Sequence, residues 1–202
     1  MKHLTVFWAA VLALLLLPLP SQEATNRREI IVSVELARDG MNPGAIGYSR
    51  SRPLTYSDFR AQPGAGNQMT VATTHTEMGF TMRTRTTGLR TEVWVTVYAG
   101  MDPELSWMRP ASRRPEILRH EQIHFDLTAI WACRMKRTME MTTFTPATLR
   151  EQLTAISTNH QDSCWAEQEQ YDRETQHSIH KDAQAYWENY MTAWLDAENC
   201  FP

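Results

Sequence analysis

Two histidines and a glutamate lie close together in the sequence, in the order H-E-Q-I-H at residues 120–124. On an α-helix, His120 and His124 would lie about one turn apart on the same face, so both imidazoles could reach one metal ion. At about 100° per residue, Glu121 would lie about 60° round the helix from His124 and face the same cavity without being a ligand. Zinc in such a site lowers the pKa of a bound water, whose proton the glutamate accepts. The motif therefore predicts a zinc site with Glu121 as general base.

A catalytic zinc site needs a third protein ligand and an open position for water. The histidines that could supply the ligand are His75, His160, His177 and His180. The segment Y-D-R-E-T-Q-H at residues 171–177 concentrates the most useful groups. It offers a ligand at His177, carboxylates that could bind or orient at Asp172 and Glu174, and at Tyr171 a phenol able to stabilise an oxyanion. Both segments also fit a less specific interpretation, an ordinary helix with a polar face.

The elements that would position these groups follow from the hydrophobic periodicity. Residues 29–37 are rich in β-branched types, and residues 91–98 (T-E-V-W-V-T-V-Y) alternate with the period of two typical of a strand with one face in a core. Two more strands are expected within residues 69–87. Glycine is absent from residue 115 onward, and helices are expected over residues 115–140, from 145 to the region 171–177, and over 181–196.

Strands first and helices second indicate an α+β fold, with an antiparallel sheet region before a helical half. At 202 residues with 42% hydrophobic and 21% charged residues, the chain fits one globular domain. We expect that domain to span residues 26–202, strand-rich over 26–110 and helical over 111–202. A net charge of −3 provides no basic surface for a phosphate backbone, so nucleic acid is not expected as a partner.

The start of the chain has the character of a signal peptide, expected over residues 1–22. Lys2 precedes an apolar run over residues 4–17, which is too short to span a bilayer comfortably. We therefore expect a secreted or periplasmic protein with no membrane span after cleavage; the alternative is an uncleaved N-terminal membrane anchor. Export permits disulfides, and one pair can form among Cys133, Cys164 and Cys200, although the sequence does not choose it.

Several segments together resemble a bacterial family known as domain of unknown function 922, described as predicted secreted zinc-dependent proteases. The resemblance runs from about residue 52 to the C-terminus. It rests on P-L-T-Y-S-D-F (53–59), residues 91–98 leading to S-W (106–107), L-R-H-E-Q-I-H-F-D (118–126), Y-D-R-E-T-Q-H (171–177) and Q-A-Y-W (184–187). The departures are small: Leu127 replaces the more usual isoleucine, and Ser178 stands where the family often has a glycine that would favour the end of a helix.

The resemblance implies a zincin-like fold in which His120 and His124 bind zinc and Glu121 is the general base. It favours His177 as third ligand, with Asp172 next. It also implies that Asp126, often a partner that orients a ligand in this family, could do so here.

Two functions are compatible with these residues. The first is a secreted zinc metallopeptidase that hydrolyses peptide bonds, in which the strand at residues 91–98 would lie beside the motif helix and pair with an extended substrate as an added strand. The second is a non-catalytic zinc-containing envelope or interaction module. In that case a fourth ligand, such as Asp172 or Glu174, would close the site. Substrate, cleavage specificity and oligomeric state do not follow from the sequence.

Overall fold

The structure, a computed structural model, describes residues 28–38, 43–64 and 70–201. The expected signal peptide at residues 1–22 lies outside them. The described elements follow the predicted order, with strands in the first half and helices in the second, so the α+β prediction is confirmed. None of the helices in the described part of the chain is both long and apolar enough to cross a membrane.

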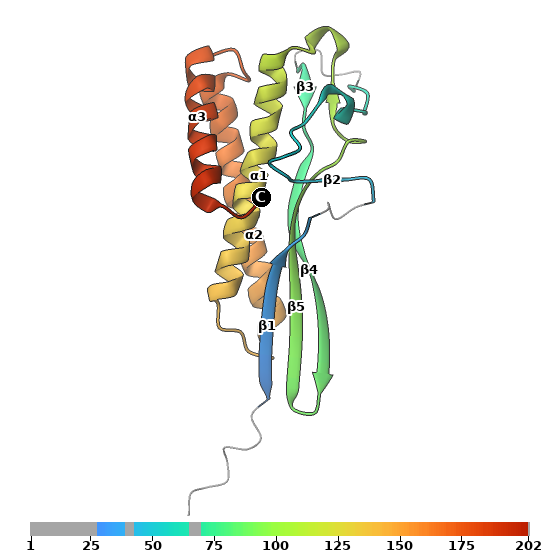
Figure 1. Cartoon of the computed structure of the whole chain (residues 1–202), viewed down its shortest axis with the longest axis vertical. Coiled ribbons are helices and arrows are strands. Elements are labelled where there is room, and N and C mark those ends of the chain that lie inside the picture. The colour runs from blue at the N-terminus through green and yellow to red at the C-terminus, as the bar shows by residue number, and fades with distance from the viewer. Residues whose placement is uncertain (1–27, 39–42, 65–69, 202) are drawn as a thin grey trace, which may run out of the picture.

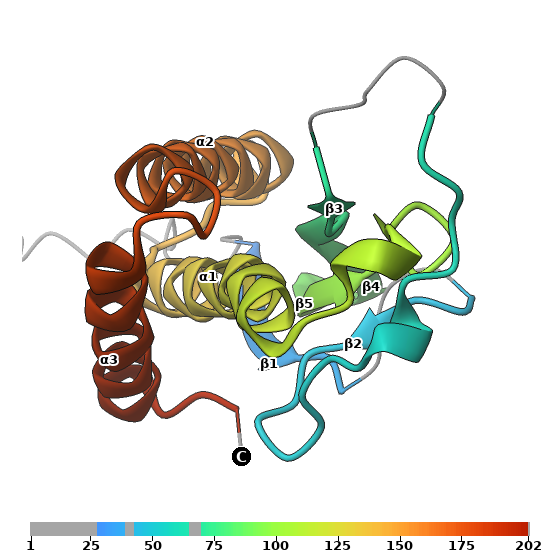
Figure 2. The same ribbon diagram turned by 90° about the horizontal axis from the view of Figure 1, so that it is seen from above.

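Three helices form the second half: α1 (Pro115–Met141), α2 (Leu149–Thr175) and α3 (Lys181–Glu198). All three were predicted, and α1 and α3 match to within two residues at each end. Helix α2 begins later than predicted because a turn comes first, in which the Thr148 amide donates to the Thr145 carbonyl. Viewed from above, α1 lies between the strands on one side and α2 and α3 on the other (Figure 2).

The main sheet is built around β5 (Arg90–Met101), which lies between its neighbours (Figure 1). Strand β4 (Thr76–Thr87) pairs antiparallel with β5 along one side. On the other side lie β1 (Glu29–Leu36), which runs parallel to β5, and the short β2 (Ile46–Gly47). A second, two-stranded sheet joins β3 (Ala72–Thr73) to β6 (Trp107–Met108).

The pairing of β1 corrects two expectations. The sheet is mixed rather than antiparallel, because β1 is parallel to β5 and the long connection between them allows the chain to cross over. Residues 91–98 also cannot pair with a substrate strand, because β1 and β4 already occupy both sides of β5. Among the described residues, the outer edge of β4 pairs with no other strand and faces helix α2, whose Gln161 amide donates to the Met78 carbonyl.

Helix α1 is buried on two sides. The alternation predicted for β5 places Val93, Val95 and Val97 in a core shared with Phe125 of α1. On its other side, α1 contributes to a second cluster with α2 and α3, made of Ile123, Leu127, Ile130, Tyr171, Trp187, Met191 and Trp194. A central helix packed on both faces is a rigid support for the side chains near its N-terminal end.

A disulfide resolves the choice among the three cysteines. Cys133 of α1 is bonded to Cys200, which follows α3, so the C-terminal end of the chain is tied to the central helix. Cys164 of α2 is free and buried.

Candidate metal centre

Helices α1 and α2 bring the predicted histidines to one carboxylate. The Nε2 atoms of His120 and His124 lie 3.1 Å and 3.2 Å from Oδ1 of Asp172. The two histidines project from adjacent turns of α1, and Asp172 faces them from near the end of α2. The two rings therefore lie on the same face of α1, as the spacing predicts, and both contact the carboxylate of Asp172.

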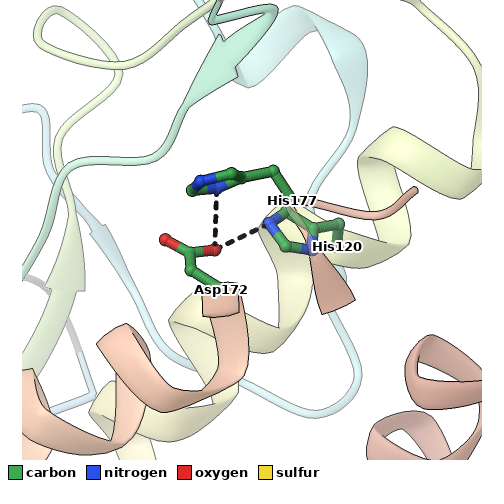
Figure 3. Close-up of side chains that lie close together, drawn as sticks. All are labelled: His120, Asp172 and His177. Carbon is green, nitrogen blue, oxygen red and sulfur yellow. Dashed lines mark hydrogen bonds and ion pairs between the residues drawn. The ribbon is translucent and has the colours of Figure 1, made fainter. Parts of the chain in front are cut away.

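His177 approaches the same oxygen from the solvent side. Its Nδ1 lies 3.4 Å from Asp172 Oδ1 (Figure 3). The side chain of His177 is 76% exposed, against 5% for His120. His177 follows the end of α2 in a turn where three successive residues have positive φ: Gln176 at 48°, His177 at 52° and Ser178 at 73°. Each costs about 1 kcal/mol in a non-glycine residue, so the turn that carries His177 is strained.

Two glutamine amides hold the buried imidazoles from behind. Gln184 Oε1 of α3 lies 3.3 Å from His120 Nδ1, and Gln168 Oε1 of α2 lies 3.0 Å from His124 Nδ1. An amide oxygen only accepts, so each Nδ1 carries the hydrogen and each Nε2 of a neutral ring has a lone pair facing the carboxylate. A lone pair and a carboxylate repel unless a cation lies between them. The arrangement therefore requires a proton or a metal ion.

The local charges favour a cation. Burial lowers the pKa of His124, but the hydrogen bond to Asp172 and the negative charges of Glu121 and Asp172 outweigh burial and raise it. Burial would raise the pKa of Asp172, but its contacts with His120 and His124 hold that pKa well below its usual range. Asp172 therefore stays ionised, and the imidazoles are in a field that attracts positive charge.

The distances fit a zinc ion. Ligands about 2.0–2.1 Å from a tetrahedral zinc lie about 3.3 Å from one another. The three histidine nitrogens each lie 3.1–3.4 Å from the Asp172 oxygen. Among the described residues, the group whose ligand atoms all lie within 4.8 Å of one another is His120, Asp172 and His177, and His124 contacts that group through the same Asp172 oxygen. Nitrogen and carboxylate ligands are a donor set that zinc prefers, and the Nδ1 atoms of His120 and His124 are held by amide oxygens.

Glu121 lies beside this cluster and has a different partner. Its Oε2 accepts a hydrogen bond of 2.5 Å from the hydroxyl of Thr74, in the segment between β3 and β4. The residue is only 5% exposed. Thr74 thus fixes the position of Oε2 of Glu121, and Oε1 accepts no hydrogen bond from any residue that the structure describes.

Tyr171 and Glu174 support the site from outside it. The Tyr171 ring stacks on His120 with centroids 4.6 Å apart, and its hydroxyl donates to Gln184 Oε1 at 2.9 Å. This phenol lies behind His120, so we do not assign it to an oxyanion. Glu174 accepts a 2.7 Å hydrogen bond from the Trp187 indole and links α2 to α3.

The other candidates lie elsewhere. Asp126 accepts hydrogen bonds from the Tyr48 hydroxyl at 2.9 Å and the Gln122 amide at 2.8 Å, and therefore joins α1 to the segment after β2. His160 contacts Thr138, 3.1 Å away, and His180 caps α3 by accepting from the Ala183 amide. His75 is exposed in the β3–β4 segment.

Asp126→Asn is expected to leave zinc binding unchanged and to stabilise the protein at pH 7 by about 1–2 kcal/mol. Burial raises the pKa of Asp126 to about 6, against about 3.9 in an unfolded chain, so a charged carboxylate costs free energy in the folded state above that pH. At about pH 4 the carboxyl of Asp126 is already protonated in the folded protein, so the variant should no longer be more stable than the native protein. Urea unfolding of both metal-free proteins at the two pH values measures this. Zinc loss in the variant would instead support an orienting role.

The two glutamines were missed at the level of sequence. A signal was present for Gln168, which precedes Asp172 by four residues on α2, as His120 precedes His124 on α1. Gln184 was part of the segment 184–187 but carried no assigned role.

Comparison with known proteins adds no further information. The chain matches no family model, no curated protein and no solved structure.

Proposed function

We propose that this protein is a zinc-dependent peptidase whose ion is held by His120, His124 and Asp172. The observation that carries the proposal is the convergence of two amide-backed imidazoles on one ionised carboxylate, 3.1 Å and 3.2 Å away. Zinc bound there would lower the pKa of a water molecule towards neutrality and polarise a carbonyl group.

The proposed ligand set gives Asp172 the place that the sequence favoured for His177. Asp172 contacts all three histidines. His177 lies 3.4 Å from Asp172, meets the His120 ring edge-on with centroids 6.5 Å apart, and is largely exposed. His177 lies at the open side of the site, where its imidazole can hydrogen-bond to a substrate.

Glu121 is the proposed general base. Thr74 holds its Oε2, so Oε1 is the atom that takes the proton from the attacking water. The same atom then delivers the proton to the amine that leaves when the C–N bond breaks. The hydroxyl of the water thus ends on the new carboxyl group, and its hydrogen ends on the new amine.

The edge of the sheet favours a peptide as substrate. Main-chain groups alternate sides along an antiparallel strand. On the β5 side, the His75 amide donates to the Ser106 hydroxyl and the His75 carbonyl accepts from the Asp102 amide. On the opposite side, the Met78 carbonyl accepts a 2.9 Å hydrogen bond from the Gln161 side-chain amide. By this alternation the main-chain groups of Thr76 point to the outer edge of β4. Thr74, two residues earlier, contacts Glu121. An extended peptide can pair there as an added strand.

The same proposal includes a zincin-like fold and an extracytoplasmic location. A sheet whose edge segment contacts the glutamate of a buried H-E-x-x-H helix supports the fold. The disulfide between Cys133 and Cys200 supports export, because such bonds persist in oxidising compartments.

The second candidate, a structural zinc clasp, has one observation in its favour. Asp172 and three histidines offer four ligands, the number that closes a structural site. The exposure of His177 and its strained turn favour an open site instead.

The native protein decides between the two. We expect one zinc per chain by elemental analysis, cleavage of members of a mixed peptide library, loss of cleavage with a chelator and recovery when zinc is added. Bound zinc without cleavage of peptides or cell-wall fragments would favour the clasp.

A further inference from the structure

A pocket of about 210 Å³ lies between the start of β4 and helix α2. It begins one helical turn, about 5 Å, beyond the metal ligands: Thr128 follows His124 on α1, and Gln168 precedes Asp172 on α2. Thr76, at the outer edge of β4, also lines it. A peptide lying along that edge would therefore extend past the mouth of this pocket.

The threonine hydroxyls and glutamine amides that line the pocket donate to or accept from other protein groups. The hydroxyls of Thr128 and Thr76 are 2.7 Å apart. The Gln161 amide donates to the Met78 carbonyl, and the Gln168 amide donates to the Cys164 sulfur at 3.3 Å. The remaining lining is the apolar surface of Met78, Cys164 and Trp165.

The pocket also lacks charge. None of its lining residues is basic, and Glu77 is its one acid. Glu77 pairs with Gly100, and its neighbours on that face are Gly79 and Tyr98. Adjacent residues of a strand point to opposite faces. Met78 packs in the core against α1, so the Glu77 side chain lies on the other face of the sheet.

The volume suits a large side chain. An apolar cavity of about 150 Å³ binds benzene, so 210 Å³ has room for leucine, methionine or phenylalanine. A charged side chain would give up part of its hydration there and meet no charged partner, so an uncharged side chain is favoured.

We propose that this pocket receives a large uncharged side chain, of leucine, methionine or phenylalanine type, from the residue next to the bond that is cleaved. The inference rests on the proposed peptidase function for its substrate. The pocket's preference for uncharged groups can be tested without turnover.

Cys164 provides that test. It lines the pocket, it is 4% exposed, and it is the free cysteine of the three, since Cys133 and Cys200 are bonded. Alkylation of the native protein by iodoacetamide, followed by mass spectrometry, reports access through the pocket. We expect saturating N-acetyl-leucinamide or N-acetyl-phenylalaninamide to slow the reaction about 5-fold or more. The aspartate and lysine analogues should leave the rate unchanged.

A pocket-filling variant tests the same inference in catalysis. Cys164→Met should lower kcat/KM for substrates with leucine or phenylalanine next to the bond by about 10-fold relative to alanine substrates. The matched control is Ala166→Met, at an exposed neighbouring position of α2 outside the pocket. If Cys164→Met does not fold, Trp165→Ala, at the exposed rim, should weaken the preference for phenylalanine instead.

Three results would overturn the inference: equal protection by charged amides, no protection by any of them, or no alkylation of the native protein at all, which would mean a closed pocket. If no peptide is cleaved while leucine and phenylalanine amides protect Cys164, the peptidase proposal fails and the pocket assignment stands.

Discussion

Asp172→Ala is expected to lower the zinc affinity of the protein by about 100-fold or more, beyond the 10–100-fold typical of losing a group that only orients a ligand. The variant removes the one oxygen that lies within 3.1–3.4 Å of all three histidine nitrogens. His120 and His124 would then have to hold the ion with the exposed His177 alone. Elemental analysis after dialysis, and competition with a chromophoric chelator, measure the loss.

Two further variants serve as comparisons for the zinc affinity of Asp172→Ala. His177→Ala should keep its zinc, with affinity reduced less than about 10-fold, because an exposed group at the open position contributes least. Asp126→Asn changes a carboxylate on α1 that faces Tyr48, and should behave as the native protein. Full zinc in Asp172→Ala together with loss in His177→Ala would return His177 to the third-ligand position. Comparable loss in both would indicate a closed four-ligand site and favour the clasp.

The helices were predictable because their signals are local. A glycine-free second half with Pro115 at the start of α1 gave helix positions close to the observed ones. The parallel pairing of β1 with β5 was not predictable, because nothing within either strand specifies which distant strand it meets. The choice of the Cys133–Cys200 disulfide likewise depended on how α3 packs against α1.

The candidate site likewise has a part that the sequence predicts and a part that depends on helix packing. His120, His124 and Glu121 share one helix, so their spacing alone fixed their relation. The place of Asp172 at the centre, and of Gln168 and Gln184 behind the rings, appears only when α2 and α3 pack on α1. One expectation could have been refined from periodicity: Asp126 is two residues after His124, about 200° round the helix and so on another face. Its contacts with Tyr48 and Gln122 lie there.

Glu121→Gln is expected to lower kcat for peptide hydrolysis by about 10²–10⁴-fold, the usual contribution of a general base, with KM and zinc content nearly unchanged. Glutamine has the same shape, and its amide oxygen can still accept the hydrogen bond from Thr74. What it cannot do is take a proton. Steady-state kinetics on a peptide that the native protein cleaves, with zinc analysis of the same samples, separates loss of the base from loss of the metal.

The control for this variant is Glu116→Gln, which removes a carboxylate from the first turn of the same helix. Glu116 is a half-exposed partner of Arg114 at 3.4 Å, so its loss should leave kcat within about 2-fold of the native value. Equal rates in the native protein and Glu121→Gln would assign the proton transfer to another group, and His177, at the open side of the cluster, would be the next to test. A fall in zinc content that parallels the fall in kcat would make Glu121 a part of the metal site instead, because a base alone has no effect on how tightly the ion is held.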